Sequence, residues 1–251
     1  MNLSAASPEE RLLIRHIGDL ADRSRRHYQV LYSHFLTPAE QQLLREVPEL
    51  AGCLSFEGGF PHAQRCLARV GTEEYQPDEA PPLRYIHFEI TDPRAEAGHR
   101  DVLGSLMGLG IKREMVGDIA ALGREGSFVC HASVEEHIQW NLQRIGHSRV
   151  RLSPGSPDDF PPPVTEDASI NISSLRLDAV CAACFHISRT QACEHIRGGT
   201  VFVNDVPVND VSRLLSPGDR LSLRGKGKVL IGPVTGKSKK DRLFVQIGIY
   251  R

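Results

Sequence analysis

The sequence predicts an α+β protein in three parts: an N-terminal α/β unit, a middle domain of alternating strands and helices, and a C-terminal domain of two helices and a small β-sheet. Helical and strand periodicities alternate along the 251 residues, and basic side chains gather in the last third. Polar segments rich in Pro separate the parts at residues 76–82 and 153–168. We therefore assign residues 1–75, 83–152 and 169–251 to the three parts, with residues 153–168 as a linker.

Two capping boxes mark helix starts in the N-terminal unit. Residues 7–10 read Ser-Pro-Glu-Glu and residues 37–40 read Thr-Pro-Ala-Glu, each with Pro at the first helical position. Apolar residues recur at helical spacing after both starts. A short strand at residues 53–57 ends at the Gly58–Gly59 turn, so we expect a small α/β unit that closes near Tyr75.

The middle domain is predicted to follow the order strand, helix, two strands, helix, strand. These elements fall at residues 84–91, 99–109, 116–122, 127–131, a helix capped by Ser133 and carrying Ile138, Leu142 and Ile145, and residues 150–152. This order is typical of a ferredoxin-like α+β sandwich.

The C-terminal domain begins with two short helices, at residues 174–185 and 189–197, the second stopped by Gly198–Gly199. Strand patterns follow at residues 201–208, 214–223, 229–231 and 243–249, the first around an Asn204–Asp205 turn. We therefore expect a small sheet behind the helix pair.

Charge is divided unevenly along the chain. The net charge is −1, but residues 170–251 carry 13 Lys and Arg against 6 Asp and Glu, a net of +7, and the other residues carry a net of −8. A basic module on an acidic body indicates that one part contacts phosphate. Without an apolar run long enough for a membrane span or a secretory leader, we expect a cytoplasmic protein with reduced cysteines.

Several C-terminal side chains suit an anion. Arg176 and Arg189 lie at helix starts, where the helix dipole disfavours a cation unless an anion docks there. Ser188 can cap the second helix and leave backbone N–H groups facing a phosphate. Lys226 and Lys228 lie in a glycine-flanked loop that RNA can approach closely. The alternative is that all five are ordinary surface residues.

These residues belong to an ordered set of motifs, at 176–178, 188–192, 196–204, 212–219 and 224–228, that resembles the S4 RNA-binding domain over about the last 80 residues. One departure is Asp205, where that family usually has Gly after Asn. The resemblance implies that RNA is bound by Arg176, Ser188, Arg189, Thr190, Gln191, His195, Asn204, Arg224, Lys226 and Lys228. Accordingly, Arg189→Glu is expected to reduce RNA affinity sharply while the fold stays intact.

Residues 34–38, the Gly58–Gly59 turn and residues 99–114 resemble the YlmH family, which extends the resemblance over nearly the whole chain. The family combines an N-terminal region, an RRM-like middle and a terminal S4 domain. The resemblance implies structured RNA (rRNA and tRNA) and the large ribosomal subunit as partners. It also implies a role in ribosome quality control, holding peptidyl-tRNA during rescue of stalled translation.

The middle domain offers a second RNA contact. Its helix is rich in glycine, which allows either close packing or a close backbone approach, and it is flanked by His99, Arg100, Lys112 and Arg113. An RRM-like fold reads bases with aromatic side chains on its strands. Tyr85 and Phe88 fall on opposite strand faces, which argues against single-strand readout by this domain.

We expect no catalytic residue, metal, cofactor or DNA partner. Residues 99–101 and 232–238 imitate kinase and P-loop motifs without the residues that should accompany them. Cys181 and Cys184 have no second cysteine pair at zinc spacing, so we expect them to fill the helical core. The alternative functions are an accessory to an RNA-modifying enzyme and a protein-interaction adaptor linked to cell division.

Overall fold

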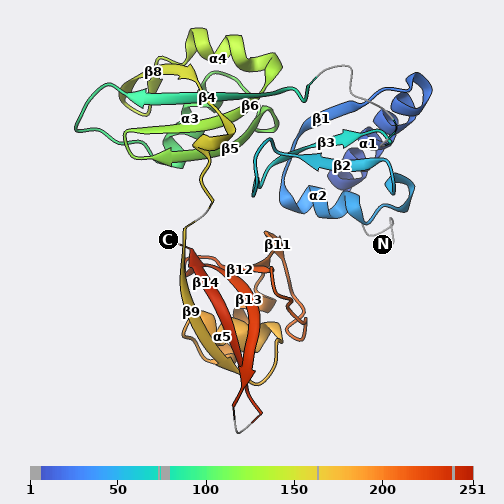
Figure 1. Cartoon of the computed structure of the whole chain (residues 1–251), viewed down its shortest axis with the longest axis vertical. Helices are drawn as coiled ribbons and strands as arrows, with labels where there is room; N and C mark the ends of the chain where they lie inside the picture. Colours follow the sequence, from blue (N-terminus) through green and yellow to red (C-terminus); the bar gives the residue numbers. More distant parts are fainter. Residues whose placement is uncertain (1–6, 73, 75–79, 163, 239–240, 251) are drawn as a thin grey trace. The chain divides into compact units, whose positions relative to one another are not determined.

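The computed structural model describes residues 7–72, 74, 80–162, 164–238 and 241–250. The chain divides into two compact units, Met1–Pro162 and Pro163–Arg251 (Figure 1). The first unit holds the predicted N-terminal and middle parts, and the second holds the C-terminal domain. The predicted end of the N-terminal part at Tyr75 and most of the connector at 76–82 lie outside the described residues.

Both N-terminal helices begin at the predicted capping boxes. α1 (Pro8–His27) is capped by Ser7, whose Oγ accepts a hydrogen bond from the Glu10 N–H at 3.1 Å, while the Glu10 carboxylate accepts from the Ser7 N–H at 2.7 Å. α2 (Pro38–Arg45) repeats this arrangement. Each box satisfies two backbone donors that have no partner within the helix, so both predicted starts are confirmed.

Three antiparallel strands accompany these helices: β1 (Leu31–Leu36), β2 (Leu54–Glu57) and β3 (Cys66–Val70), in the order β1-β3-β2. The sequence pattern predicts only β2. β3 is buried at four of its five positions, so it lacks the polar–apolar alternation that identifies a half-buried strand.

The middle part has the predicted ferredoxin-like arrangement, an antiparallel sheet with two helices on one face (Figure 1). Its elements are β4 (Leu83–Ile90), α3 (His99–Gly108), β5 (Val116–Leu122), β6 (Glu125–His131), α4 (Glu135–Asn141), β7 (Arg144–Ile145) and β8 (Ser148–Pro154). The strand order is β5-β6-β4-β8-β7. Short 3-10 helices complete the unit at Pro48–Leu50, Arg113–Met115, Ala132–Val134 and Pro157–Asp159.

The second helix of this domain differs from the prediction. Ser133 does not cap α4: it lies in the 3-10 helix before it and donates its N–H to His131 Nδ1 at 3.2 Å. α4 ends before Leu142, and Ile145 belongs to β7. Both apolar side chains are still buried in the core of the middle domain, and Gly146 (φ +57°) forms the turn from β7 into β8.

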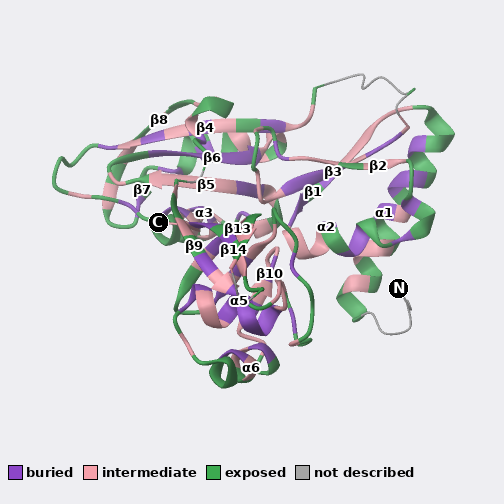
Figure 2. Cartoon of the chain, turned by 60° about the horizontal axis from the view of Figure 1, so that its bottom comes forward, coloured by how far each residue is buried: buried purple, intermediate pink, exposed green. Residues whose placement is uncertain are grey.

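The N-terminal part covers the sheet face opposite the helices. Phe35 and Leu67 pack there against Val129 of β6, and Tyr85 donates its hydroxyl to the Gly59 carbonyl oxygen at 2.7 Å. Phe160, from the segment after β8, joins the same cluster. Buried residues therefore continue from β3 to β6 (Figure 2). This covered face is the one with which an RRM-like sheet reads bases.

The second unit is a six-stranded antiparallel sheet with two helices. Its elements are β9 (Thr165–Ile172), α5 (Leu177–Cys184), α6 (Arg189–Arg197), β10 (Val201–Val203), β11 (Val206–Pro207), β12 (Arg220–Leu223), β13 (Gly227–Lys237) and β14 (Leu243–Tyr250). The strand order is β11-β10-β12-β13-β14-β9. The two predicted helices and the Asn204–Asp205 turn, with φ of 53° and 64°, are confirmed.

Two predicted boundaries in this region are wrong. The segment 153–168 is not a simple linker: β8 extends to Pro154, Phe160 is buried, and β9 begins at Thr165 and pairs with β14 along its whole length. The predicted strand at 214–223 is confined to Arg220–Leu223, whereas β13 is much longer than residues 229–231. The abundant Pro, Ser, Gly and Asp at 153–163 predict a linker, but the segment also contains Phe160, whose buried ring anchors it to the first unit.

Candidate nucleic-acid interface

Asp178 joins the two predicted arginines of the helix pair. Its Oδ1 accepts a hydrogen bond from Arg176 Nε at 3.2 Å and its Oδ2 accepts one from Arg189 Nη2 at 2.5 Å. The carboxylate is 7% exposed, whereas the side chains of Arg176 and Arg189 are 40% and 55% exposed. A buried anion thus holds two exposed cations at the starts of α5 and α6, and the group keeps a net positive charge.

The Asp178 carboxylate stays ionised because of these partners. Burial by itself raises the pKa of Asp178, but the hydrogen bonds from Arg189 and Arg176 outweigh burial and leave that pKa below its ordinary value. Each guanidinium has five N–H donors, so both arginines keep donors for an external anion.

The start of α6 is built as predicted. Ser188 Oγ accepts from the Gln191 N–H at 3.1 Å, and Gln191 Oε1 accepts from the Ser188 N–H at 3.0 Å. Ser188 and the Gln191 side-chain oxygen therefore serve the cap. The N–H groups of Arg189 and Thr190 have no acceptor within the helix because they lie in its first turn, and both residues are exposed.

A hollow of about 440 Å³ lies beside Arg189. Arg242 lines it as well and donates Nη2 to the Asn171 carbonyl oxygen at 2.6 Å. Sequence reasoning missed Arg242 and the positioning role of Asp178. The signal for Asp178 was present, since an acidic residue two positions after Arg176 falls in the first turn of the same helix.

Two predicted residues have structural roles. Asn204 donates Nδ2 to Asp219 at 2.8 Å and accepts the Arg220 N–H at 2.9 Å, so both ends of its amide hold the β10–β11 turn against β12. His195 Nδ1 lies 3.0 Å from Thr200 Oγ1, which joins the end of α6 to the residue before β10. The proposed RNA contacts of Asn204 and His195 would compete with these bonds.

The departure at Asp205 has a clear consequence. Asp205 forms ion pairs with Arg220 at 3.1 Å and with Lys228 at 2.8 Å. Lys228 Nζ also lies 5.8 Å from the centre of the Tyr250 ring. An acidic residue therefore offsets part of the positive charge on this surface, where a glycine would leave both cations unpaired.

The loop between β12 and β13 keeps exposed cations. Arg224 and Lys226 are exposed, and the glycines between and after them have φ of 81° and 119°. Arg224 lies 5.6 Å from the Phe202 ring and donates its backbone N–H to the Thr200 carbonyl oxygen at 3.0 Å. Thr200 therefore joins the loop to the end of α6 near His195.

The predicted second contact is only partly available. Arg113 does not face solvent: it donates to the carbonyl oxygens of Val116 and, at 3.2 Å, Gly117. Burial, followed by the charge of Arg65, lowers the pKa of Arg113 to about 10. Arg65 donates to the Val116 and Phe35 carbonyl oxygens at 3.0 and 3.2 Å, so Arg65 links the N-terminal part to β5, whereas the side-chain bonds of Arg113 stay within the middle domain.

The other residues of that set are more accessible. His99 and Arg100 lie exposed at the start of α3, and Lys112 pairs with Glu114 at 3.7 Å. Burial, and then the charge of Arg113, lowers the pKa of His99. Arg100 and Lys112 are thus the exposed cations of the set, and Lys112 has a carboxylate beside it.

One cluster imitates a catalytic triad but cannot act as one. Ser127 Oγ donates to Asp159 at 2.9 Å and lies 3.1 Å from His87 Nδ1. The serine sits between the other two groups and is 1% exposed, whereas a nucleophile must be reachable and paired with a base held by the acid. The cluster fastens the segment after β8 to the sheet.

Cys181 and Cys184 lie in the core of the second unit, and burial raises the pKa of each thiol to about 12. Among the described residues, no three His, Cys, Asp or Glu side chains converge in the manner of metal ligands. No described helix has the length and apolar character needed to cross a membrane.

The fold and the basic helix pair define an S4-domain RNA-binding protein. Family comparisons match the "S4 domain" over residues 175–221 and the "Putative RNA-binding domain in YlmH" over residues 85–158. The sequence is 33% identical over 219 residues to the "Ribosome-associated protein quality control protein P2" of Bacillus subtilis (strain 168), covering 86% of this chain and 85% of that protein. The chain belongs to the YlmH family.

A solved structure supports the fold. The "Cell division protein ylmH from Streptococcus pneumoniae" matches with a TM-score of 0.50 and 20% identity, over 60% of this chain and 93% of that chain. At this identity the likeness concerns the fold alone, so the cell-division name of the S. pneumoniae protein does not favour an adaptor function here.

Proposed function

We propose that this protein binds rRNA and tRNA on the large ribosomal subunit and acts in rescue of stalled translation by stabilising peptidyl-tRNA, without catalysing a reaction. The observation that carries the proposal is the arginine pair that Asp178 holds at the helix starts of an S4 domain. The B. subtilis relative is named for ribosome association and quality control. The setting proposed here is the cytoplasm, with no cofactor, metal or DNA.

The geometry suits the backbone of folded RNA. Guanidinium groups bind phosphate oxygens through paired donors, and the first turn of α6 adds backbone N–H groups. Such contacts position a protein on RNA without reading its sequence. Each phosphate that is neutralised releases counterions, so affinity should fall steeply as salt concentration rises.

The test is sedimentation of the tagged full-length protein with ribosomes through sucrose gradients, comparing wild type with an Arg176→Gln, Arg189→Gln double variant. Glutamine is preferable to glutamate because Arg189→Glu would set two carboxylates side by side at Asp178. Wild type should travel with the large subunit, and the variant should remain near the top. Thermal unfolding of the variant checks that the fold survives.

The matched control is Arg11→Gln, Arg15→Gln, which removes two exposed cations from α1 in the acidic unit. The control should sediment like wild type. Wild type that stays at the top in low salt, even with stalled complexes present, would contradict the proposal. Recovery of protein partners that resists RNase would then favour an adaptor.

A further inference from the structure

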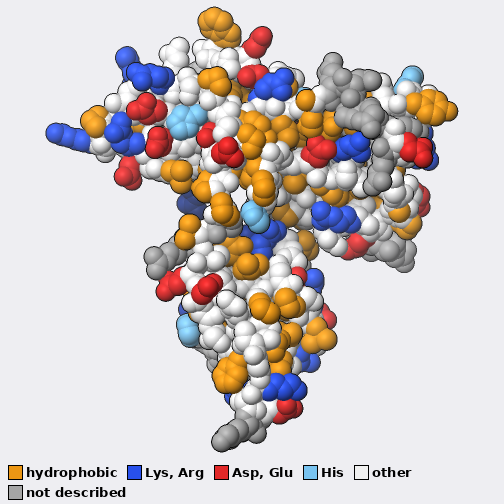
Figure 3. Space-filling view, in the orientation of Figure 1, with side chains coloured by type: hydrophobic (Ala, Val, Ile, Leu, Met, Phe, Trp, Pro, Cys, Tyr) orange, Lys and Arg blue, Asp and Glu red, His pale blue; other side chains and the backbone are white. Residues whose placement is uncertain are grey.

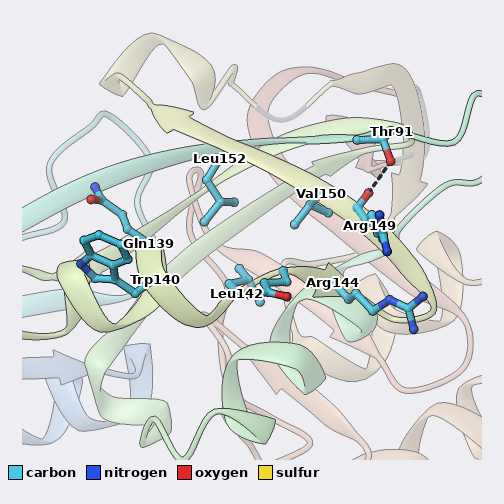
Figure 4. Close-up of a pocket in the computed structure, with 9 residues that line it drawn as sticks. Thr91, Gln139, Trp140, Leu142, Arg144, Arg149, Val150 and Leu152 are labelled. Carbon is cyan, nitrogen blue, oxygen red and sulfur yellow. Dashed lines mark hydrogen bonds between the residues drawn. The ribbon is translucent and has the colours of Figure 1, made fainter.

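A groove with a volume of about 670 Å³ opens in the middle domain, between the end of α4 and strands β7 and β8 (Figure 4). Trp140 lies at one end and Arg144 and Arg149 lie at the other, with apolar side chains of Leu142, Val150 and Leu152 between them. The volume is in the range of small-molecule sites. The groove lies at the β8 side of the sheet, away from the strand face that the N-terminal part covers.

Trp140 is the chain's one tryptophan, and its side chain is 80% exposed. The phenylalanines of the domain core, Phe88 and Phe128, are fully buried. Figure 3 shows a hydrophobic side chain projecting over α4 and basic side chains on the same part of the unit. An exposed indole offers a flat surface for stacking, and the hollow beside it leaves room for the rest of a ligand.

The two arginines of the groove differ from their neighbours. Arg124 and Arg151 both pair with Glu89, at 3.5 and 3.6 Å. Among the described residues, neither Arg144 nor Arg149 has a carboxylate within ion-pair distance, and no acidic residue lines the groove. The groove therefore combines an aromatic face, an apolar floor and unpaired positive charge.

We propose that this groove binds an unpaired nucleotide of RNA, with its base stacked on Trp140 and its phosphate held by Arg144 and Arg149. A nucleotide matches both ends of the groove, because it joins a planar base to an anion. Aromatic stacking plus backbone cations is how proteins hold single strands without strict sequence preference. The inference rests on the proposed RNA-binding function and gives the middle domain, which matches the "Putative RNA-binding domain in YlmH", a defined nucleotide site distinct from the start of α3.

The sequence-based prediction against single-strand readout considers only aromatic residues on the strands, Tyr85 and Phe88, and therefore does not cover this groove. Trp140 lies on a helix, in the short α4 whose end the sequence does not predict. The amides of Gln139 and Gln143 also line the groove and can meet base edges.

Trp140 is the chain's one tryptophan, so its fluorescence reports directly on binding in the groove. Full-length protein is titrated with a short unstructured single-stranded RNA while tryptophan fluorescence is excited selectively. Stacking should quench the fluorescence, and Arg144→Gln, Arg149→Gln should weaken the apparent affinity at least about fivefold. The control is Arg151→Gln, which removes an arginine that lies on β8 like Arg149 but pairs with Glu89 of β4. This variant should leave the titration unchanged. Trp140→Ala should weaken binding of labelled RNA to a similar extent.

A parallel titration separates this proposal from the S4 proposal. Arg189→Gln should lower affinity for structured ribosomal RNA while the quenching by single-stranded RNA persists. Absent quenching in wild type, with Arg189→Gln still impairing structured RNA, would overturn the groove and leave the S4 function standing. Loss of both signals would overturn both. Stronger quenching by an acidic peptide than by RNA would assign the groove to a protein partner and also overturn the nucleotide site.

Discussion

Asp178 Oδ2 accepts a hydrogen bond from Arg189 Nη2 at 2.5 Å and thereby ties the first turn of α5 to the first residue of α6. The carboxylate is buried and the guanidinium is exposed. The pair therefore does more than stabilise the helices: it holds a cation in place before any anion arrives, which lowers the entropy lost on binding.

Asp178→Asn should destabilise the second unit by about 2 kcal/mol, because hydrogen bonds to a charged partner contribute about 1.5–3 kcal/mol each and the arginines would regain some of this from water. RNA affinity should fall too, since Arg176 and Arg189 lose their common anchor. Urea unfolding and RNA titration at one salt concentration measure both. An Asp178→Asn variant with full affinity would show that the cations need no anchor.

Acid should weaken the same region. The pKa of Asp178 is lower in the folded state than its ordinary value of 3.8. The stabilisation that the ionised carboxylate provides is therefore fully present above that ordinary pKa and is lost as pH falls through the folded pKa. The protection factors of the α5 amides, which are corrected for the intrinsic pH dependence of exchange, should therefore fall in wild type below about pH 4. They should fall less in Asp178→Asn over the same change of pH, and an equal fall would exclude Asp178 as the cause.

Asp205→Gly should raise RNA affinity about two- to tenfold and make its salt dependence steeper by about one unit, because Arg220 and Lys228 lose the carboxylate that pairs with them. The turn should tolerate glycine, since Asp205 has φ of +64°. Affinity measured across a salt series tests this. Asp241→Asn frees one exposed lysine in the same unit and serves as the control.

Local signals predicted much of the fold. The boxes at Ser7 and Thr37 place helix starts because the cap depends on residues three apart, and the Asn204–Asp205 turn follows from its own residues. β3 escaped prediction because it is buried at four of its five positions and lacks alternation. β9 at Thr165–Ile172 escaped because it pairs with β14 at the far end of the chain.

The candidate site was predictable in the two arginines at the helix starts but not in Arg242 or in the partner that positions them. The motif positions identified Arg176 and Arg189, whereas the buried role of Asp178 depends on how two helices meet. Arg113 illustrates the reverse case. Its charge and position suggest an RNA contact, but the guanidinium donates to backbone carbonyls three and four residues further along the chain.

The glycines of α3 make a separate prediction. Sequence alone allows Gly104 to serve tight packing, but a Cβ atom there would meet nothing within 4 Å among the described residues. Gly104→Ala should therefore stabilise the first unit by about 0.5–1 kcal/mol through helix propensity. Gly59→Ala is the contrasting variant, because its Cβ would clash with Tyr85 Oη and its φ is +87°. Thermal unfolding should rank them in opposite directions around wild type.

Arg113→Ala should destabilise the first unit by about 2 kcal/mol, since the Gly117 carbonyl oxygen loses its charged donor while the Val116 carbonyl oxygen keeps the one from Arg65. RNA affinity should stay unchanged as long as the variant is folded. Arg100→Ala, at the exposed start of α3, should do the opposite: stability should hold within about 0.5 kcal/mol, while any loss of RNA affinity would identify the second contact. Weakened RNA binding by a folded Arg113→Ala would contradict this prediction and would assign the effect either to Arg113 itself or to His99, whose pKa the charge of Arg113 lowers.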